Sequence, residues 1–205
     1  MKKVFVLAAA LMLFAAPAMA VISGSKHDFT QAPYNATEIC VFCHTPHGAD
    51  TSVADAPLWN HYTTTQTFTT YTSASLDGTI TSPSGRSKLC LSCHDGVTAI
   101  DAYGGATTGT PMATGIAANL GTDLSNDHPV SVTYEDAANG GTDAGLRAAD
   151  AAVGTSVTNG GVTLPLYTDK VECASCHDVH NGGAGQPMLR ASNANSALCL
   201  VCHNK

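Results

Sequence analysis

The residues that could do chemistry are cysteines and histidines arranged in four copies of one short motif. All eight cysteines belong to C-x-x-C pairs, and a histidine directly follows each pair. On one turn of a helix, positions i, i+3 and i+4 share a face, so each motif presents two thiols and an imidazole together. The copies are "CVFCH" at 40–44, "CLSCH" at 90–94, "CASCH" at 173–177 and "CLVCH" at 199–203.

This spacing is typical of covalent haem attachment, in which two thiols add to the vinyl groups of one haem and the histidine ligates the iron from below. We therefore expect four covalently attached c-type haems. Two alternatives remain: zinc sites, which also use C-x-x-C pairs, and four disulfides, which are common in exported chains. The expected attachment residues are Cys40, Cys43, Cys90, Cys93, Cys173, Cys176, Cys199 and Cys202, and the expected proximal ligands are His44, His94, His177 and His203.

The second axial ligand of each iron must come from outside the motif. Beyond the N-terminal segment only Met112 and Met188 remain, which are too few to cap four haems. Bis-histidine ligation of most or all haems is therefore predicted, and it gives lower reduction potentials than His/Met ligation. The histidines left over for this role are His27, His47, His61, His128 and His180.

An internal repeat chooses among these five histidines. Each half of the chain carries a lone histidine, then C-x-x-C-H-x-x-H, then L-C-L-x-C-H, so that His27, His47, His128 and His180 occupy matching places and are the predicted distal ligands. Aligning "APLWNHY" (56–62) with "QPMLRAS" (186–192) leaves His61 without a counterpart. We expect His61 to contact a haem propionate or to pack, with a ligand role as the alternative. His47 is too near His44 to cross the same haem, so it should ligate another one.

Composition and the N-terminus set the class of protein. Residues 1–20, "MKKVFVLAAALMLFAAPAMA", have the pattern of a secretory signal peptide, so the chain is expected to be exported without a membrane span. Only 6% of residues are aromatic and 12% are charged, against about 25% charged in ordinary domains. With so few large side chains, the haems must fill the interior. We predict a haem-cored, mostly irregular chain with short helices at the CxxCH motifs and few strands.

The repeat also predicts the organisation of the chain. We expect a first two-haem module at 21–108 and a second at 109–205, joined as one continuous haem-stacked unit. Asp169 and Glu172 are predicted to cap a helix that begins at Cys173, and Ser87 to cap the turn that carries Cys90. The weakly alternating segment 63–85 is predicted to form a hairpin that turns at Asp77-Gly78.

The string "GSKHDF … CVFCHTPHGA … PLWN … LCLSCHDG … DHPVS … CASCHDVHNG … LCLVCH" resembles the doubled-CxxCH multihaem c-type cytochromes of metal-respiring bacteria. Within that group the chain resembles the secreted tetrahaem cytochromes that polymerise into extracellular filaments, the cytochrome nanowires. The resemblance implies a continuous chain of haems. It also implies that His47, in "CHTPH", ligates a haem of the neighbouring subunit.

These observations predict an electron-transfer protein with no catalytic residues, located between the periplasm and the cell surface or beyond it. Its expected partners are itself, as a head-to-tail homopolymer, or other cytochromes, and a terminal acceptor such as an extracellular metal oxide. The formal charge of −7 argues against a nucleic-acid partner. Two alternatives stay open: a monomeric soluble periplasmic tetrahaem carrier, and a multihaem reductase with an open haem site.

Overall fold

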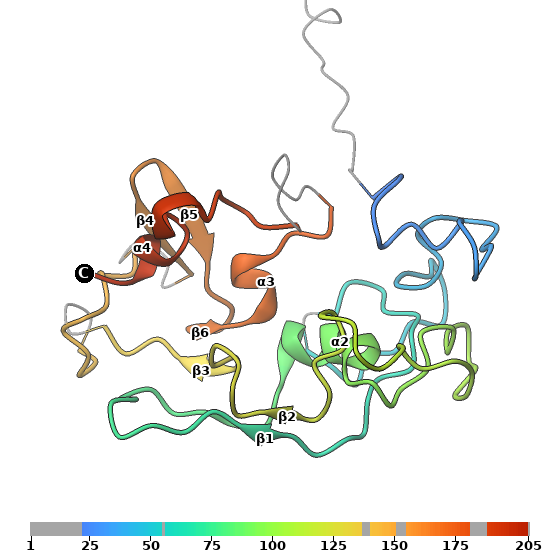
Figure 1. Ribbon diagram of the computed structural model, residues 1–205, viewed down its shortest axis with the longest axis horizontal. Coiled ribbons are helices and arrows are strands. Elements are labelled where there is room, and N and C mark those ends of the chain that lie inside the picture. The colour runs from blue at the N-terminus through green and yellow to red at the C-terminus, as the bar shows by residue number, and fades with distance from the viewer. Residues whose placement is uncertain (1–21, 55, 137–139, 151–154, 181–187, 205) are drawn as a thin grey trace, which may run out of the picture.

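Turns and irregular segments make up most of the chain (Figure 1). The structure, a computed structural model, describes residues 22–54, 56–136, 140–150, 155–180 and 188–204, so the expected signal peptide lies outside the described residues. The helices are α2 (Gly85–His94), α3 (Cys173–Cys176) and α4 (Cys199–Cys202), with a 3-10 turn η2 at Ala194–Ser196. The predicted class, mostly irregular with short helices at the motifs, is confirmed. Within the described ranges, no helix has the length and apolar run needed to cross a membrane.

Each motif is wound into at least one helical turn. The last three motifs coincide with α2, α3 and α4. The first motif is a turn rather than a helix, in which the His44 N–H donates to the Cys40 carbonyl at 2.9 Å. The same bond joins His177 to Cys173 at 3.0 Å and His203 to Cys199 at 2.9 Å. The two thiols and the histidine of each motif are therefore held on one turn, as the spacing predicts.

Short strand pairs hold the segments between the motifs. In the described residues, β1 (Thr69–Thr70) pairs in parallel with β2 (Asp123–Leu124). The antiparallel pairs are β3 (Val132–Thr133) with β6 (Lys170–Val171), and β4 (Ser156–Asn159) with β5 (Val162–Pro165). β1–β2 and β3–β6 join segments that are distant in the sequence. α2 and α3 lie next to each other near the middle of the molecule (Figure 1).

The predicted hairpin at Asp77-Gly78 is wrong. The chain after Gly78 pairs with β3, where the Thr133 N–H donates to the Thr79 carbonyl at 3.1 Å. A Cβ on Gly78 would lie 2.6 Å from the Thr133 carbonyl oxygen, so this glycine permits close backbone approach rather than a turn. The observed hairpin is β4–β5, which turns through Gly160 and Gly161 with φ of 58° and 79°. Positive φ at both turn residues is the requirement of a type I′ turn.

The described side chains form two small apolar clusters, and both lie against motif cysteines. The first is built on Val157, Leu164, Leu166, Leu198 and Val201, with Cys176 and Cys202 packed against it. The second is built on Val53, Trp59 and Leu89, with Cys43 packed against it. The apolar residues therefore gather where the haems are expected to attach.

Candidate haem sites

Among the described residues, histidine rings from outside the motifs face motif histidines in three places. His27 lies 6.0 Å from His94 between ring centroids, and His180 lies 6.0 Å from His44. His128 lies 6.3 Å from His203. Two imidazoles that ligate one metal from opposite sides, with metal–nitrogen bonds of about 2 Å each, have ring centroids on the order of 6 Å apart. The three pairs therefore have the spacing of axial ligand pairs.

The pairs follow the internal repeat. The lone histidine of each half, His27 or His128, faces the histidine of the second motif in its own half. The pair of His44 with His180 is different, because it joins the first motif of one half to the first motif of the other. The rings of this pair are nearly parallel, with an interplanar angle of 23°. The segment from His177 to His180 therefore links two expected haem sites, as the C-x-x-C-H-x-x-H spacing suggests.

Backbone carbonyls lie beside the Nδ1 atoms of several of these histidines. The Nδ1 of His44 is 2.5 Å from the Pro57 carbonyl oxygen, and that of His94 is 2.7 Å from Ala118. The Nδ1 of His128 is 3.0 Å from the Pro129 carbonyl oxygen. A ring that donates from Nδ1 keeps the Nε2 lone pair for a metal, which is the usual arrangement of ligating histidines.

The repeat extends to the backbone around the first motif of each half. The Thr45 N–H donates to the Leu58 carbonyl at 2.9 Å, and Asp178 makes the same bond to Met188 at 2.7 Å. Leu58 and Met188 also share a positive φ, of 52° and 54°. Asn60 and Arg190 then bind the second cysteine of their own motif by equivalent backbone bonds. This register places His61 opposite Ala191, in agreement with the alignment of 56–62 with 186–192.

The cysteines of the second and third motifs meet where α2 packs on α3. The Cys173 thiol raises the pKa of Cys90 and the Cys90 thiol lowers the pKa of Cys173, because the two side chains lie close together. The pKa of His27 is lowered to about 4, first by burial and then by the neighbouring His94 and His177 side chains. The second and third haem sites are therefore adjacent.

The first and fourth motifs also lie beside their neighbours in the sequence. Burial raises the pKa of Cys93, and the nearby Cys43 of the first motif raises it further. Burial likewise raises the pKa of Cys202 to about 11, with Cys176 of the third motif as the next cause. Motifs that follow one another in the sequence are therefore also neighbours in space. None of the eight cysteines forms a disulfide, so the disulfide scaffold is not the arrangement seen.

The two remaining histidines have different surroundings. His61 is 2% exposed, its Nε2 lies 3.0 Å from the Ile100 carbonyl oxygen, and its Nδ1 lies 2.8 Å from the Tyr62 carbonyl oxygen. Its Nε2 is also 3.3 Å from the Cys93 sulfur. His47 is exposed, at the edge of a cleft of about 730 Å³. His61 thus has the contacts of a packing residue beside a haem-attachment cysteine, whereas His47 faces outward.

Buried polar atoms without partners test whether haem fits these sites. In the described part of the chain they are the Nδ1 of His27, the Nε1 of Trp59 and the Nε of Arg86. His27 faces the histidine of the second motif, Trp59 packs near Cys43, and Arg86 lies in α2 one turn before Cys90. Haem propionates accept hydrogen bonds, so the indole and guanidinium donors would suit them. In His27, as in the other histidines, Nε2 is the nitrogen that would ligate iron, and its Nδ1 is the atom without a partner. The unpartnered atoms of Trp59 and Arg86 therefore fit haem. Trp59 and Arg86 were missed by sequence reasoning, because neither belongs to a motif.

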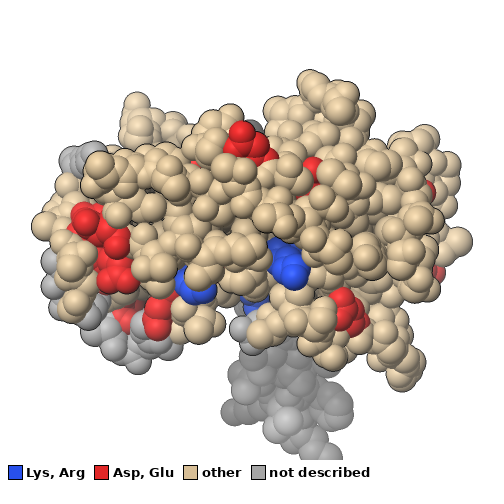
Figure 2. Space-filling view, turned by 90° about the horizontal axis from the view of Figure 1, so that it is seen from below, with Lys and Arg blue, Asp and Glu red and all other residues tan. Residues whose placement is uncertain are grey.

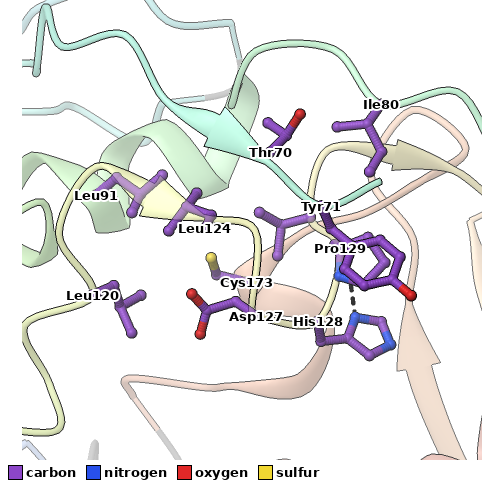
Figure 3. A pocket seen from close by; sticks show the side chains of 11 residues that line it. Thr70, Tyr71, Ile80, Leu91, Leu120, Leu124, Asp127, His128, Pro129 and Cys173 are labelled. Atoms are coloured by element: carbon purple, nitrogen blue, oxygen red, sulfur yellow. Dashed lines mark hydrogen bonds between the residues drawn. The ribbon is translucent and has the colours of Figure 1, made fainter. Parts of the chain in front are cut away.

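The space beside Cys173 has an apolar wall (Figure 3). A cavity of about 40 Å³ lies among Leu91, Leu120 and Leu124, with the Cys173 sulfur at its edge and the His128 ring nearby. This volume receives only the edge of a macrocycle. Its lining nevertheless suits the apolar rim of a haem attached at Cys173.

One comparison with known proteins bears on these sites. Residues 165–205 match the family model described as the doubled CXXCH motif. The matched segment contains the third and fourth motifs, with Cys173, Cys176, Cys199 and Cys202. The match supports a family of multihaem c-type cytochromes, with covalently bound haem and a part in electron transfer. No curated protein shows significant similarity to the chain.

Proposed function

We propose that this protein is an exported tetrahaem c-type cytochrome that transfers electrons and transforms no substrate. The observation that carries the proposal is the set of three histidine pairs at 6.0–6.3 Å, each of which brings an outside ring to a motif histidine. Bound haem iron supplies the one-electron couple. The chain's own part is to space the sites, to provide axial ligands and to exclude water.

The test of this proposal is the number and ligation of the haems. The mature protein should carry the mass of four haems, keep them after denaturation, and show six-coordinate low-spin spectra. A double variant, Cys90→Ala with Cys93→Ala, should lose the mass of one haem, because its second motif has no thiols. A chain that carries zinc, or that shows a permanently open iron site, would contradict the proposal and favour a reductase in the second case.

A finer proposal is that subunits join through His47. In the repeat, His47 corresponds to His180 and His44 corresponds to His177. His180 faces His44 across the two halves. The same contact made between molecules would bring His47 of one copy to His177 of the next, and repetition of this head-to-tail contact yields a fibre rather than a closed ring.

The surroundings of His47 support an intermolecular role. Its side chain is exposed and stands at a cleft lined also by Asp50, Trp59 and Thr107. The face of the molecule in Figure 2 is mostly uncharged, with scattered acidic groups and few basic ones. Such a face offers little charge complementarity for association, and only 6% of the residues in the sequence are aromatic. An iron–histidine bond would add the directional affinity that such a surface lacks. Other cytochromes or an extracellular metal oxide would then accept the electrons.

His47→Ala should abolish filaments and leave soluble subunits with one five-coordinate or water-ligated haem. The measurements are electron microscopy of the secreted fraction and the high-spin absorbance of the purified protein. Thr107→Ala, at the same cleft, is the matched control and should polymerise normally. Filaments from the His47 variant, or a wild-type monomer with four bis-histidine haems, would favour the monomeric soluble carrier.

A further inference from the structure

α2 and α3 cap each other's first turns. The Ser87 N–H, in the first turn of α2, donates to the Glu172 Oε2 at 3.2 Å. In return, the Cys173 N–H at the start of α3 donates to the Ser87 Oγ at 2.9 Å. The first N–H groups of a helix have no partner within it, so each helix here receives an acceptor from the other. The exchange joins the second haem motif to the third.

The carboxyl group of Glu172 lies in the interior of this contact. Glu172 is 2% exposed, and its Oε2 also accepts a hydrogen bond from the Ser131 hydroxyl at 3.0 Å. Ser131 is fully buried. Both donors to Oε2 are neutral, and among the described residues the ion pair found is that of Arg190 with Asp178. The ionised carboxylate can make both contacts, because Oε2 is the acceptor in each.

The position of Glu172 puts this charge beside two haem-attachment points. Glu172 directly precedes Cys173, whose thiol lies close to that of Cys90. A negative charge that is shielded from water acts strongly on its neighbours, because the interior has a low dielectric constant. A negative charge near a haem iron stabilises the oxidised state, because that state carries one more positive charge than the reduced state. The expected effect is a lower reduction potential.

We propose that Glu172 positions the second and third haem sites against each other and lowers the reduction potentials of both. This role rests on the proposed function, because it requires haems at both motifs. It makes the central pair of sites the more easily oxidised part of the chain of haems. Sequence reasoning had assigned Glu172 only a capping role.

Glu172→Gln separates charge from structure, because the amide oxygen can accept both hydrogen bonds while the charge is gone. We expect four haems, unchanged low-spin spectra and a rise in two of the four midpoint potentials in a spectroelectrochemical titration. Glu38→Gln is the matched control. Glu38 lies two residues before Cys40 but is exposed, so water screens its charge and a smaller shift is expected. Equal shifts in the two variants would overturn the proposal.

Glu172→Asp tests the same role from the other side, and it decides the matter if the glutamine variant does not mature. The shorter side chain keeps the charge but draws it away from Ser87 and Ser131. We expect four haems, potentials close to wild type and a lower thermal unfolding midpoint. A rise in potential despite the retained charge would overturn the proposal. Wild-type protein with fewer than four haems would instead contradict the proposed function, and this is measured before any variant.

Discussion

Single histidines differ in what they face, and this decides the effect of removing each one. His180 and His128 face motif histidines, whereas His61 is buried between the carbonyl oxygens of Tyr62 and Ile100. Residue type alone does not distinguish the expected ligand histidines from His61. The internal repeat distinguishes them, because His61 has no counterpart in the second half of the sequence. The ring contacts distinguish the same residues, and the ligand roles stay a prediction.

His180→Ala or His128→Ala should convert one haem to a high-spin or water-ligated form, because each change removes the ring opposite one motif histidine. His61→Ala should leave every haem low-spin but cost about 1–3 kcal/mol of unfolding free energy, since it leaves the buried Ile100 carbonyl unpaired. Absorption or EPR spectra and thermal unfolding measure the two effects. Spectral loss in the His61 variant alone would show that the repeat assigns the ligands wrongly.

Elements in this protein are stabilised mainly by their neighbours. α3 and α4 span a single turn each, and helices of that length do not form alone. Ser87 was predicted to cap its own turn, and this is wrong. α2 begins earlier, after Ser84, and the Ser87 hydroxyl accepts the N–H of Cys173 in the other helix. The predicted cap at Glu172 is observed, because Glu172 is the N-cap of α3 in a capping box with Ser175, whose Oγ accepts the Glu172 N–H at 3.0 Å. Asp169 instead lies in a turn with a positive φ of 58°.

Ser87→Ala should lower the unfolding free energy by about 0.5–2 kcal/mol, the usual cost of losing a helix cap. The cost is expected because the change removes the hydroxyl group that accepts the hydrogen bond from the Cys173 N–H at the start of α3. Ser84→Ala is the control: Ser84 is the N-cap of α2, but its side chain makes no capping bond. Thermal or denaturant unfolding of the haem-loaded protein compares them. An equal loss in both variants would mean that the cap at Cys173 contributes nothing.

The whole molecule has a small polypeptide core for its length. In the described residues, one apolar cluster is built on five aliphatic side chains and the other on Val53, Trp59 and Leu89, and both lie against motif cysteines. Such clusters bury too little apolar surface to offset the conformational entropy of a long irregular chain. We therefore expect the fold to depend on bound haem, which would stabilise the folded chain.

The chain produced without haem attachment should lack a cooperative unfolding transition. Its haem-loaded form should unfold cooperatively at high temperature. Far-UV circular dichroism and calorimetry of the two forms, prepared from the same sequence, provide the comparison. A haem-free chain that unfolds cooperatively would show that the polypeptide core suffices, and the haem-cored description would then be wrong.

The amino-acid sequence predicts covalent haem attachment, because each CxxCH motif lies within one turn whose backbone hydrogen bonds join neighbouring residues. It also determined the repeat and the mostly irregular fold. The hairpin that turns at Gly160-Gly161 could also have been predicted, because a Gly-Gly pair is a local turn signal, but sequence reasoning missed it. Three contacts could be seen only in the folded structure. The His180 ring lies beside that of His44, and Gly78 lies against the Thr133 carbonyl. Ser87 and Glu172 accept hydrogen bonds from the first turns of each other's helices. These contacts join residues far apart in the chain, so packing and loop closure select them, and no local propensity encodes them.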